Sequence, residues 1–391
     1  MVERLSVRAR TLWTLAVLAA IAVVVTPAVA DNLVGSRKGG SEVRAWGSWV
    51  NVAFTDGQQG DRPAPGQIDG LSGVVSMAAG IGSHYAVRSD GTLWAWGNND
   101  RGQLGNGKTD ASALTVPRQV NGLADVVAVA AGGSSAYAVR SDGTLWAWGN
   151  NGAGQLGDGT TTNRLEPVRV KGVTGVVDVV AGSWSGYALG EDGTVWAWGS
   201  NYRGQLGDGS VKDRSVPGKV DGLEGVRSLA TVGASVYAVL PDGTVRAWGS
   251  NDAGELGDGT TTSWSTPTPV AGLRAVRAVA AGERSAYALL DDGTVRAWGA
   301  NSSGQLGDGT REDRLTPVPV EGLRGAAGIA AGSSCAYAVL EDGTVRAWGD
   351  GELGQLGSGG TSGSTSPARV PGVASATGVV AHAAAAFALV D

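Results

Sequence analysis

The chain has 391 residues, of which 65 are glycine, 42% are hydrophobic and 17% are charged. The glycines follow no strict Gly-X-Y period, which excludes collagen, and the hydrophobic fraction excludes a disordered chain. The net charge is −6 and no long basic run follows residue 10, which argues against a nucleic-acid-binding protein.

Residues 1–30 have the pattern of a signal peptide. A positive segment ending at Arg10 precedes an apolar stretch over 12–25, and Ala28-Val29-Ala30 matches a cleavage site. The apolar stretch is shorter than a membrane span of ~20 residues. We therefore expect cleavage and no stable membrane span, with an uncleaved anchor as the alternative. In both cases the protein is expected outside the cytoplasm, secreted or at the cell surface, with residues 31–40 as a linker.

From residue 41 onward the chain repeats with a period of about 50 residues. Three residue types keep one register over seven copies. A Trp-Gly pair recurs at Trp46, Trp96, Trp148, Trp198, Trp248, Trp298 and Trp348. Proline recurs at 65, 117, 167, 217, 267, 317 and 367, and Gly before Leu or Val at 70, 122, 172, 222, 272, 322 and 372. We expect the seven tryptophans to be structural, because each side chain buries ~150–250 Å².

The third copy shows what one unit encodes. Asp192-Gly193 predicts a two-residue hairpin turn, and four short strands are predicted over 167–170, 175–181, 185–189 and 194–199. Four strands per repeat, without any amphipathic helical pattern, are typical of one propeller blade. We predict an all-β fold, a seven-bladed β-propeller with four strands per blade, over residues 41–391.

The two ends of the chain complement each other. The last copy stops one residue before its Asp-Gly turn, and residues 42–47 match the strand that is then missing. We predict that the last blade combines three C-terminal strands with one N-terminal strand. Such closure leaves no open sheet edge between the first and last blades.

The repeat resembles that of the regulator of chromosome condensation family. The similarity lies in Ala-Ala-Gly at 130–132 and 330–332, the Asp-Gly turn, the Arg-Ala-Trp-Gly or Trp-Ala-Trp-Gly strand, and Asn-x-x-Gly-Gln-Leu-Gly. It covers about residues 41–391 and implies the seven-bladed fold. The family includes a nuclear nucleotide-exchange factor for the GTPase Ran, scaffolds, and secreted bacterial inhibitors of β-lactamases. We identify the chain as a secreted, bacterial-type member.

Binding without catalysis is the function that we predict: an extracytoplasmic scaffold or inhibitor, monomeric, without a cofactor, with a protein partner and no nucleic acid. Guanine-nucleotide exchange is the alternative by family analogy. The signal peptide argues against it, and so do the uniform repeats, which leave room for only two extra residues around 108–113. A secreted propeller enzyme acting on carbohydrate is the third hypothesis, and it requires paired carboxylates at the mouth of the ring.

Two sets of residues are candidate partner contacts. Two residues before the repeat tryptophan, three successive copies have Trp and the other four have Arg: Trp94, Trp146, Trp196, Arg246, Arg296, Arg346 and Arg44. Both residue types are favoured in interfaces, and packing between blades duplicated in two batches is the alternative. The second set is aromatic and interrupts the repeat pattern in loops: Trp184, Tyr202, Trp264 and Trp49.

Other reactive residue types have a structural interpretation. His84 and His382 are the two histidines, and neither belongs to a catalytic motif. Cys335 replaces a recurring Ser, which indicates a packing role. One Asp per Gly-Asp-Gly loop is too few for calcium, which needs several converging oxygens. We interpret these residues as Asx-turn residues: Asp158, Asp208, Asp258 and Asp308.

Overall fold

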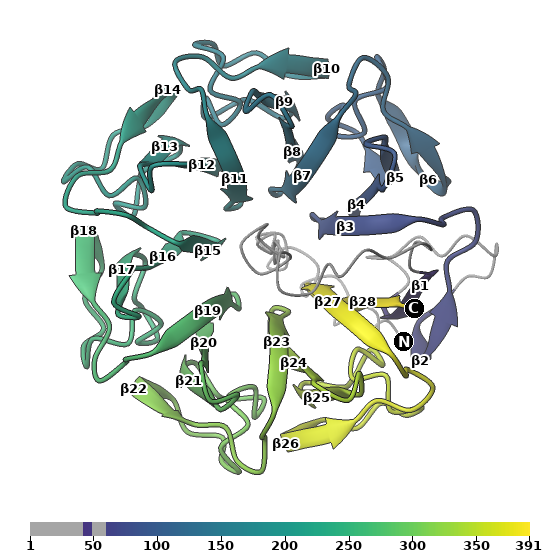
Figure 1. The fold of residues 1–391 in the computed structure, drawn as a ribbon, viewed down its shortest axis with the longest axis vertical. Helices are drawn as coiled ribbons and strands as arrows, with labels where there is room; N and C mark the ends of the chain where they lie inside the picture. Colours follow the sequence, from purple (N-terminus) through teal and green to yellow (C-terminus); the bar gives the residue numbers. More distant parts are fainter. Residues whose placement is uncertain (1–41, 49–59) are drawn as a thin grey trace, which may run out of the picture.

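The computed structural model describes residues 42–48 and 60–391. The predicted signal peptide, the predicted linker 31–40 and Trp49 lie outside these ranges. The described chain forms seven four-stranded antiparallel sheets arranged around a central axis (Figure 1). The predicted all-β, seven-bladed propeller is thereby confirmed. Within the described ranges, no helix is long and apolar enough to cross a membrane.

The strands occupy four positions from the axis to the rim. Innermost are β3 (Val74–Ala79), β7 (Val126–Ala131), β11 (Val176–Ala181), β15 (Ser228–Val232), β19 (Val276–Ala281), β23 (Ala326–Ala331) and β27 (Ala376–His382). Second are β4 (Ser83–Arg88), β8 (Ser135–Arg140), β12 (Ser185–Gly190), β16 (Ser235–Val239), β20 (Ser285–Leu290), β24 (Cys335–Leu340) and β28 (Ala385–Val390).

The third position holds the strands with the repeat tryptophan: β5 (Leu93–Asn99), β9 (Leu145–Gly149), β13 (Val195–Gly199), β17 (Val245–Gly249), β21 (Val295–Gly299), β25 (Val345–Gly349) and β1 (Glu42–Gly47). The outer strands are β6 (Asp110–Gln119), β10 (Arg164–Arg169), β14 (Arg214–Lys219), β18 (Trp264–Pro269), β22 (Arg314–Pro319), β26 (Ser364–Arg369) and β2 (Arg62–Gln67). Blades 1 to 6 follow chain order from β3 to β26. Blade 7 is β27, β28, β1 and β2.

The predicted composition of the last blade is wrong in one respect. Blade 7 combines two C-terminal strands with two N-terminal strands, in the order β2-β1-β28-β27. The proline-containing strand was predicted at the start of a blade. It is instead the outer strand of the preceding blade, since the chain returns after the long loop to pair with the strand it has just left, as Trp196 does with Lys219. The predicted pairing of residues 42–47 with the C-terminal strand is confirmed, with Glu42 opposite Val390.

The blades are fastened to each other by the repeat tryptophans. All seven are fully buried. The indole Nε1 of Trp148 in blade 2 donates to the Gln103 carbonyl oxygen of blade 1 at 2.7 Å, and the Tyr85 hydroxyl of blade 1 donates to the same oxygen at 2.6 Å. Equivalent tryptophan bonds of 2.7 to 2.9 Å join Trp198 to Gln155, Trp248 to Gln205, Trp298 to Glu255, Trp348 to Gln305 and Trp46 to Gln355.

The glycine after each repeat tryptophan is required by close packing. Gly199 has φ +99°, and a β-carbon there would collide with the Trp184 carbonyl oxygen in the neighbouring turn. Glycine is the residue that adopts this backbone conformation without strain. The Trp-Gly pair thus combines a buried side chain with a backbone position at which no side chain fits.

Candidate functional site

The propeller has two faces, because neighbouring strands in each sheet run in opposite directions. The loop face holds the turns between first and second strands and the loops between third and outer strands. The hairpin face holds the Asp-Gly hairpins and the connections between blades. Trp184, in the β11–β12 turn, and Tyr202, in the β13–β14 loop, therefore lie on the loop face. The Trp and Arg residues two before the repeat tryptophan lie toward the hairpin face, so the ten candidates within the described residues do not form one site.

Trp184 and Tyr202 line one pocket of about 220 Å³, the Trp184 pocket, between loops of blades 3, 4 and 5. The two side chains are 45% and 63% exposed. Between blades 3 and 5, the β15–β16 turn of blade 4 contributes only Gly233 and Ala234 to the lining. Two large aromatic residues next to a turn of two small ones leave this part of the loop face hollow.

The Trp184 pocket is also lined by five charged side chains: Arg203, Asp252, Glu255, Glu283 and Arg284. Arg203 and Asp252 form an ion pair with a nitrogen–oxygen distance of 3.1 Å. Arg284 is exposed. Two carboxylates, those of Glu255 and Glu283, therefore remain without an ion pair within 4 Å among the described residues.

Glu255 is the most buried of these charged groups, at 2% exposure. Its Oε2 accepts a hydrogen bond from the Ala253 amide at 2.7 Å, and its Oε1 accepts one from the Ser250 hydroxyl at 3.0 Å. These bonds hold the carboxylate in one orientation at the pocket wall.

Glu283 lies in the β19–β20 turn and is partly buried. Burial raises the pKa of Glu283 above its ordinary value, against the opposing effects of the nearby Ser333 side chain and of the Arg284 charge. Sequence reasoning missed both glutamates. A signal existed, because Glu255 replaces the glutamine of Gly-Gln-Leu-Gly and Glu283 follows the Ala-Ala-Gly segment, where the sister turns have small or apolar residues.

Trp264 lies outside this pocket, at the start of outer strand β18. Its Nε1 donates to Asp258 Oδ2 at 2.8 Å. In sister blades an arginine occupies this position and binds the equivalent carboxylate, as Arg164 does with Asp158 at 2.6 Å. Trp264 therefore replaces an arginine in bracing its loop, and its indole remains 39% exposed.

The interpretation of the loop aspartates as Asx-turn residues is confirmed. Asp158 Oδ1 accepts hydrogen bonds from the Thr160 amide at 2.9 Å and from the Thr160 hydroxyl at 2.7 Å. The side-chain amide of Asn151 donates to the same oxygen at 3.2 Å. Within 42–48 and 60–391, no group of three or more His, Cys, Asp or Glu residues could hold a metal ion.

The switch from Trp to Arg two residues before the repeat tryptophan coincides with an exchange on the neighbouring strand. Trp94, Trp146 and Trp196 are half-buried and pack against the apolar clusters of the blades. The neighbouring strand has Arg88, Arg140 or Gly190 in these blades, and the Arg88 guanidinium lies 4.0 Å from the centre of the Trp94 ring.

In the four arginine blades, an aliphatic residue at that neighbouring position packs against the clusters instead: Leu240, Leu290, Leu340 and Val390. The arginines are half-buried beside them: Arg246, Arg296, Arg346 and Arg44. In each blade an apolar side chain therefore packs against the cluster, from the tryptophan position in three blades and from the neighbouring strand in the other four. Partner binding by the row stays a prediction.

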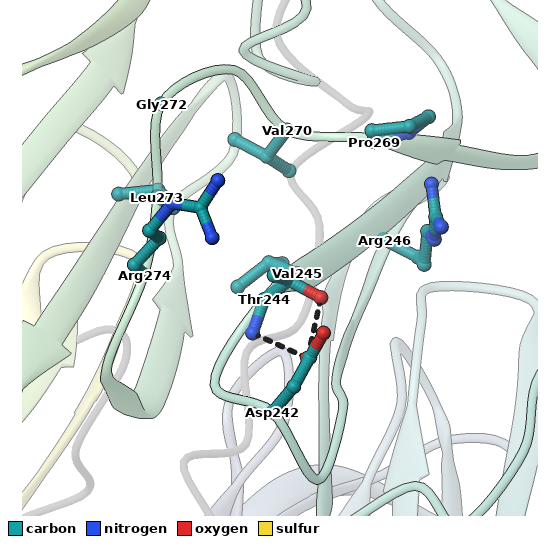
Figure 2. A pocket seen from close by; sticks show the side chains of 9 residues that line it. All are labelled: Asp242, Thr244, Val245, Arg246, Pro269, Val270, Gly272, Leu273 and Arg274. Atoms are coloured by element: carbon teal, nitrogen blue, oxygen red, sulfur yellow. Dashed lines mark hydrogen bonds between the residues drawn. The ribbon is translucent and has the colours of Figure 1, made fainter.

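Figure 2 shows one member of this row in a second pocket, of about 310 Å³, on the hairpin face of blade 4. Arg246 and Arg274 line it together with Pro269. The carboxylate of Asp242 is turned toward Thr244, whose hydroxyl and amide donate to it at 2.7 and 2.9 Å and lower the pKa of the carboxyl. The two arginines have no carboxylate within ion-pair distance among the described residues.

The cysteine and the histidines are structural. Cys335 is buried, its sulfur lies 3.3 Å from the Tyr337 hydroxyl, and burial raises the pKa of its thiol to about 12. The predicted packing role is confirmed, since Cys335 is 1% exposed and belongs to the buried apolar cluster that contains Tyr337 and Val339. His84 and His382 are fully buried, and the His84 ring centre lies 5.0 Å from that of Phe387.

The chain is thus a closed seven-bladed propeller with a pocket on its loop face. The family model of the RCC1-like domain matches residues 42–390. The chain therefore belongs to the RCC1-like domain family, as the repeat resemblance implied.

Named relatives match parts of the chain. The ultraviolet-B receptor UVR8 of Arabidopsis thaliana is 35% identical over 142 residues, which are 35% of this chain and 32% of UVR8. The human E3 ubiquitin-protein ligase HERC2 is 34% identical over 129 residues, 32% of this chain and 3% of HERC2. The protein RCC2 homolog of Danio rerio is 40% identical over 81 residues, 20% of this chain and 16% of that protein. The matches span a third or less of each relative, and all three relatives are eukaryotic.

Solved structures agree on the fold. Human WBSCR16 superposes with a TM-score of 0.78 at 24% identity, covering 90% of this chain and 99% of that one. Yeast RCC1 (Prp20), in its crystal structure bound to Kap60, superposes with a TM-score of 0.80 at 21% identity, covering 90% and 89%. At these identities the likeness establishes the architecture and not the partner.

Proposed function

We propose that the protein is an extracytoplasmic binding module that holds a protein partner on its loop face and performs no catalysis. The observation that supports this most is the Trp184 pocket, where two exposed aromatic side chains lie on a scaffold fastened blade to blade. Aromatic residues in a partly enclosed pocket are typical centres of protein interfaces. The location outside the cytoplasm is proposed from the signal-peptide pattern of residues 1–30.

Family membership is consistent with protein binding. The yeast relative Prp20 has been crystallised with Kap60, and a second structure of it is described together with its binding to Gsp1p and histones. We propose that this chain uses the same architecture for another protein, in the secreted or envelope fraction of the cell that makes it.

Site-specific photo-crosslinking tests the proposal. Benzoylphenylalanine placed at position 202 keeps an aromatic group in the pocket, whereas the same group at position 264 keeps one on the rim. We expect a discrete adduct from position 202 in the envelope or secreted fraction, lost when Trp184→Ser is added, and no such adduct from position 264. Equal labelling from both positions, or a position-202 adduct that survives Trp184→Ser, would contradict the proposal.

The carbohydrate alternative has one observation in its favour, because Glu255 and Glu283 bring two carboxylates into one aromatic pocket. Against it, Glu255 is only 2% exposed and two hydrogen bonds from the protein hold its carboxylate in one orientation, which disfavours a role as the general base that activates water. We expect no hydrolysis of chromogenic glycosides or of polysaccharides. Activity that Glu283→Gln abolishes would establish the enzyme instead.

Nucleotide exchange is not supported by the one insertion in the repeat. The two extra residues around 108–113 are taken up by outer strand β6, which is 10 residues long where the other outer strands have 6, so they form no protruding wedge. We expect no acceleration of nucleotide release from small GTPases. Acceleration of nucleotide release by the wild-type protein would make nucleotide exchange the favoured function.

A further inference from the structure

We propose that the Trp184 pocket takes a lysine or arginine side chain of the partner protein. The inference rests on the proposed function, since it names the chemistry of the group that the partner inserts. Three independent properties of the pocket support it: its aromatic walls, its excess of carboxylates, and the departure of its residues from the repeat.

The aromatic walls suit a cation. Trp184 and Tyr202 come from two different loops of blade 3 and line the same cavity. A cation within ~6 Å of an indole or phenol face is attracted by the negative face of the ring, and the attraction strengthens as water is excluded. The aliphatic stem of a Lys or Arg side chain would at the same time cover the apolar part of these rings.

The charges of the pocket favour a cation over an anion. Arg203 is already paired with Asp252, and Arg284 is exposed to solvent. The carboxylate of Glu255 is fixed at the wall, and Glu283 lies partly buried in the adjacent turn. An anion would meet two carboxylates without an ion pair, whereas a cation would complete the pairing.

The fold does not require these residues, because sister blades manage without them. The position of Glu255 is glutamine in five other copies, and Gln155 Oε1 accepts the Ala153 amide at 2.8 Å just as Glu255 accepts the Ala253 amide. The equivalents elsewhere in the ring are Ser134 and Ser334 for Trp184, Gly152 and Ser302 for Tyr202, and Ser183 and Ser333 for Glu283. A charge that replaces an amide of the same shape, next to aromatic residues that replace small ones, indicates recognition rather than packing.

The repeat supplies substitutions that preserve the fold. Trp184→Ser, Tyr202→Ser, Glu255→Gln and Glu283→Ser each restore the residue of a sister blade. Gln355→Glu is the matched control, because it adds the same carboxylate to the equivalent loop of blade 6, outside the Trp184 pocket. Circular dichroism and thermal melting of every variant verify the propeller before binding is measured.

The probes are end-blocked peptides Gly-Gly-X-Gly-Gly, in which X is lysine, arginine, norleucine or glutamate. Binding is followed by ¹⁹F NMR of the full chain labelled with 5-fluorotryptophan, with the Trp184 resonance assigned by Trp184→Ser. We expect saturable shifts with lysine and arginine, and binding at least about fivefold weaker with norleucine, which has the stem without the charge. Glu255→Gln and Glu283→Ser should each weaken lysine binding about 3- to 10-fold, and Gln355→Glu should not.

Several results would overturn the inference: no peptide binding, norleucine as tight as lysine, a preference for glutamate, or a Glu255→Gln variant that binds as the wild type does. If the crosslinked adduct at position 202 still forms, any of these results would exclude a lysine or arginine as the inserted group but would still support protein binding. Conversely, peptide binding without an adduct that depends on Trp184 removes the protein-binding function and leaves a cation-selective pocket.

Discussion

A single carbonyl oxygen joins neighbouring blades at six of the seven junctions; the Trp96 indole N–H of blade 1 has no hydrogen-bond partner among the described residues. The Gln205 oxygen accepts from Tyr187 of its own blade at 3.0 Å and from Trp248 of the next blade at 2.9 Å. Both donors are fully buried, so no water can replace a lost bond. The repeat tryptophan is therefore both a core side chain and a connection between sheets.

Replacing Trp248 tests this double role. We expect Trp248→Ala to lower the free energy of unfolding by about 3–5 kcal/mol through lost burial and the cavity it leaves. Trp248→Phe keeps much of the volume but leaves the Gln205 oxygen with one donor fewer, so its cost should fall between that of alanine and zero. Denaturant unfolding of the three proteins provides the comparison, and an unmoved midpoint for the alanine variant would exclude the core assignment.

Asp178 is a carboxyl buried in blade 3. It lies on innermost strand β11 and is 2% exposed. Its Oδ1 accepts the Val179 amide at 2.9 Å, and its Oδ2 has no hydrogen-bond partner among the described residues. Burial raises the pKa of Asp178 to about 7. Because the folded state holds this proton more tightly than the unfolded chain, stability falls as pH rises from about 4 through 7.

Asp178→Ala should remove that pH dependence, since the equivalent residue of blade 2 is Ala128. We expect the variant to gain up to about 4 kcal/mol over the wild type at pH 8 and little at pH 4. Urea unfolding at both pH values measures the difference, with Ser76→Ala in blade 1 as a control at the same strand position. A gain that is equal at both pH values would show that the carboxyl does not titrate in this range.

The roles of residues could be predicted where the same residue type recurs at the same position of the repeat. The seven tryptophans, Cys335 and the Asx-turn aspartates each stand in a column of equivalent residues, and their burial or hydrogen bonding follows from that column. Trp184 and Tyr202 were predicted as exceptions to their columns. Their proximity to Glu255 was not predicted. It depends on how the loops of three different blades are placed relative to each other, and no local sequence pattern encodes that placement.

At the scale of the element, the third strand and its neighbour exchange residues as a pair. In blade 3, Trp196 packs over Gly190, where an added β-carbon would lie 2.9 Å from the indole ring. In blade 4 the same two positions hold Arg246 and Leu240. The space that an indole fills in one blade is thus filled by leucine in the next.

A double-mutant cycle in blade 3 tests this exchange. Gly190→Leu alone should collide with the indole, and Trp196→Arg alone should leave a gap, each at a cost of about 1–3 kcal/mol. The double variant recreates the pair of blade 4, so its cost should fall below the sum of the single costs by about 1–3 kcal/mol. Chemical unfolding of the four proteins gives the coupling energy. Additive costs would leave the Trp-to-Arg switch without a packing reason and strengthen its interpretation as a binding surface.

The strands could be predicted from the repeat period, but which strand begins each blade could not. Any cut through a cyclic repeat yields a four-strand unit, so the proline strand at 167–170 was assigned to the wrong sheet. Its partner is decided by pairing in space: Arg169 lies opposite Trp146, in the strand before it. The error did not change the predicted number of blades or of strands per blade. It changed only how many strands of the last blade come from each end of the chain.

At the scale of the whole molecule, the shared seventh blade closes the ring. Removing β1 and β2, residues 42–67, would leave β28 with an unpaired edge after the two strands of blade 7 that remain. Such an edge is a template for association. We expect oligomers or aggregates of the truncated protein by size-exclusion chromatography with light scattering, whereas deletion of residues 31–40 should leave its state unchanged. A monomeric truncated protein with an unchanged melting temperature would show that closure is dispensable.

The hydrogen bond from Trp46 to Gln355 spans 309 residues. At about 5–20 residues per second of synthesis, the acceptor emerges roughly 15–60 s after its donor. During that time the N-terminal strands lack their partners, and contacts so distant in sequence also slow folding after release. The ring therefore closes only when the whole chain has been made. A product that ends early has no complete seventh blade and is exposed to proteolysis, even if its first six blades have folded.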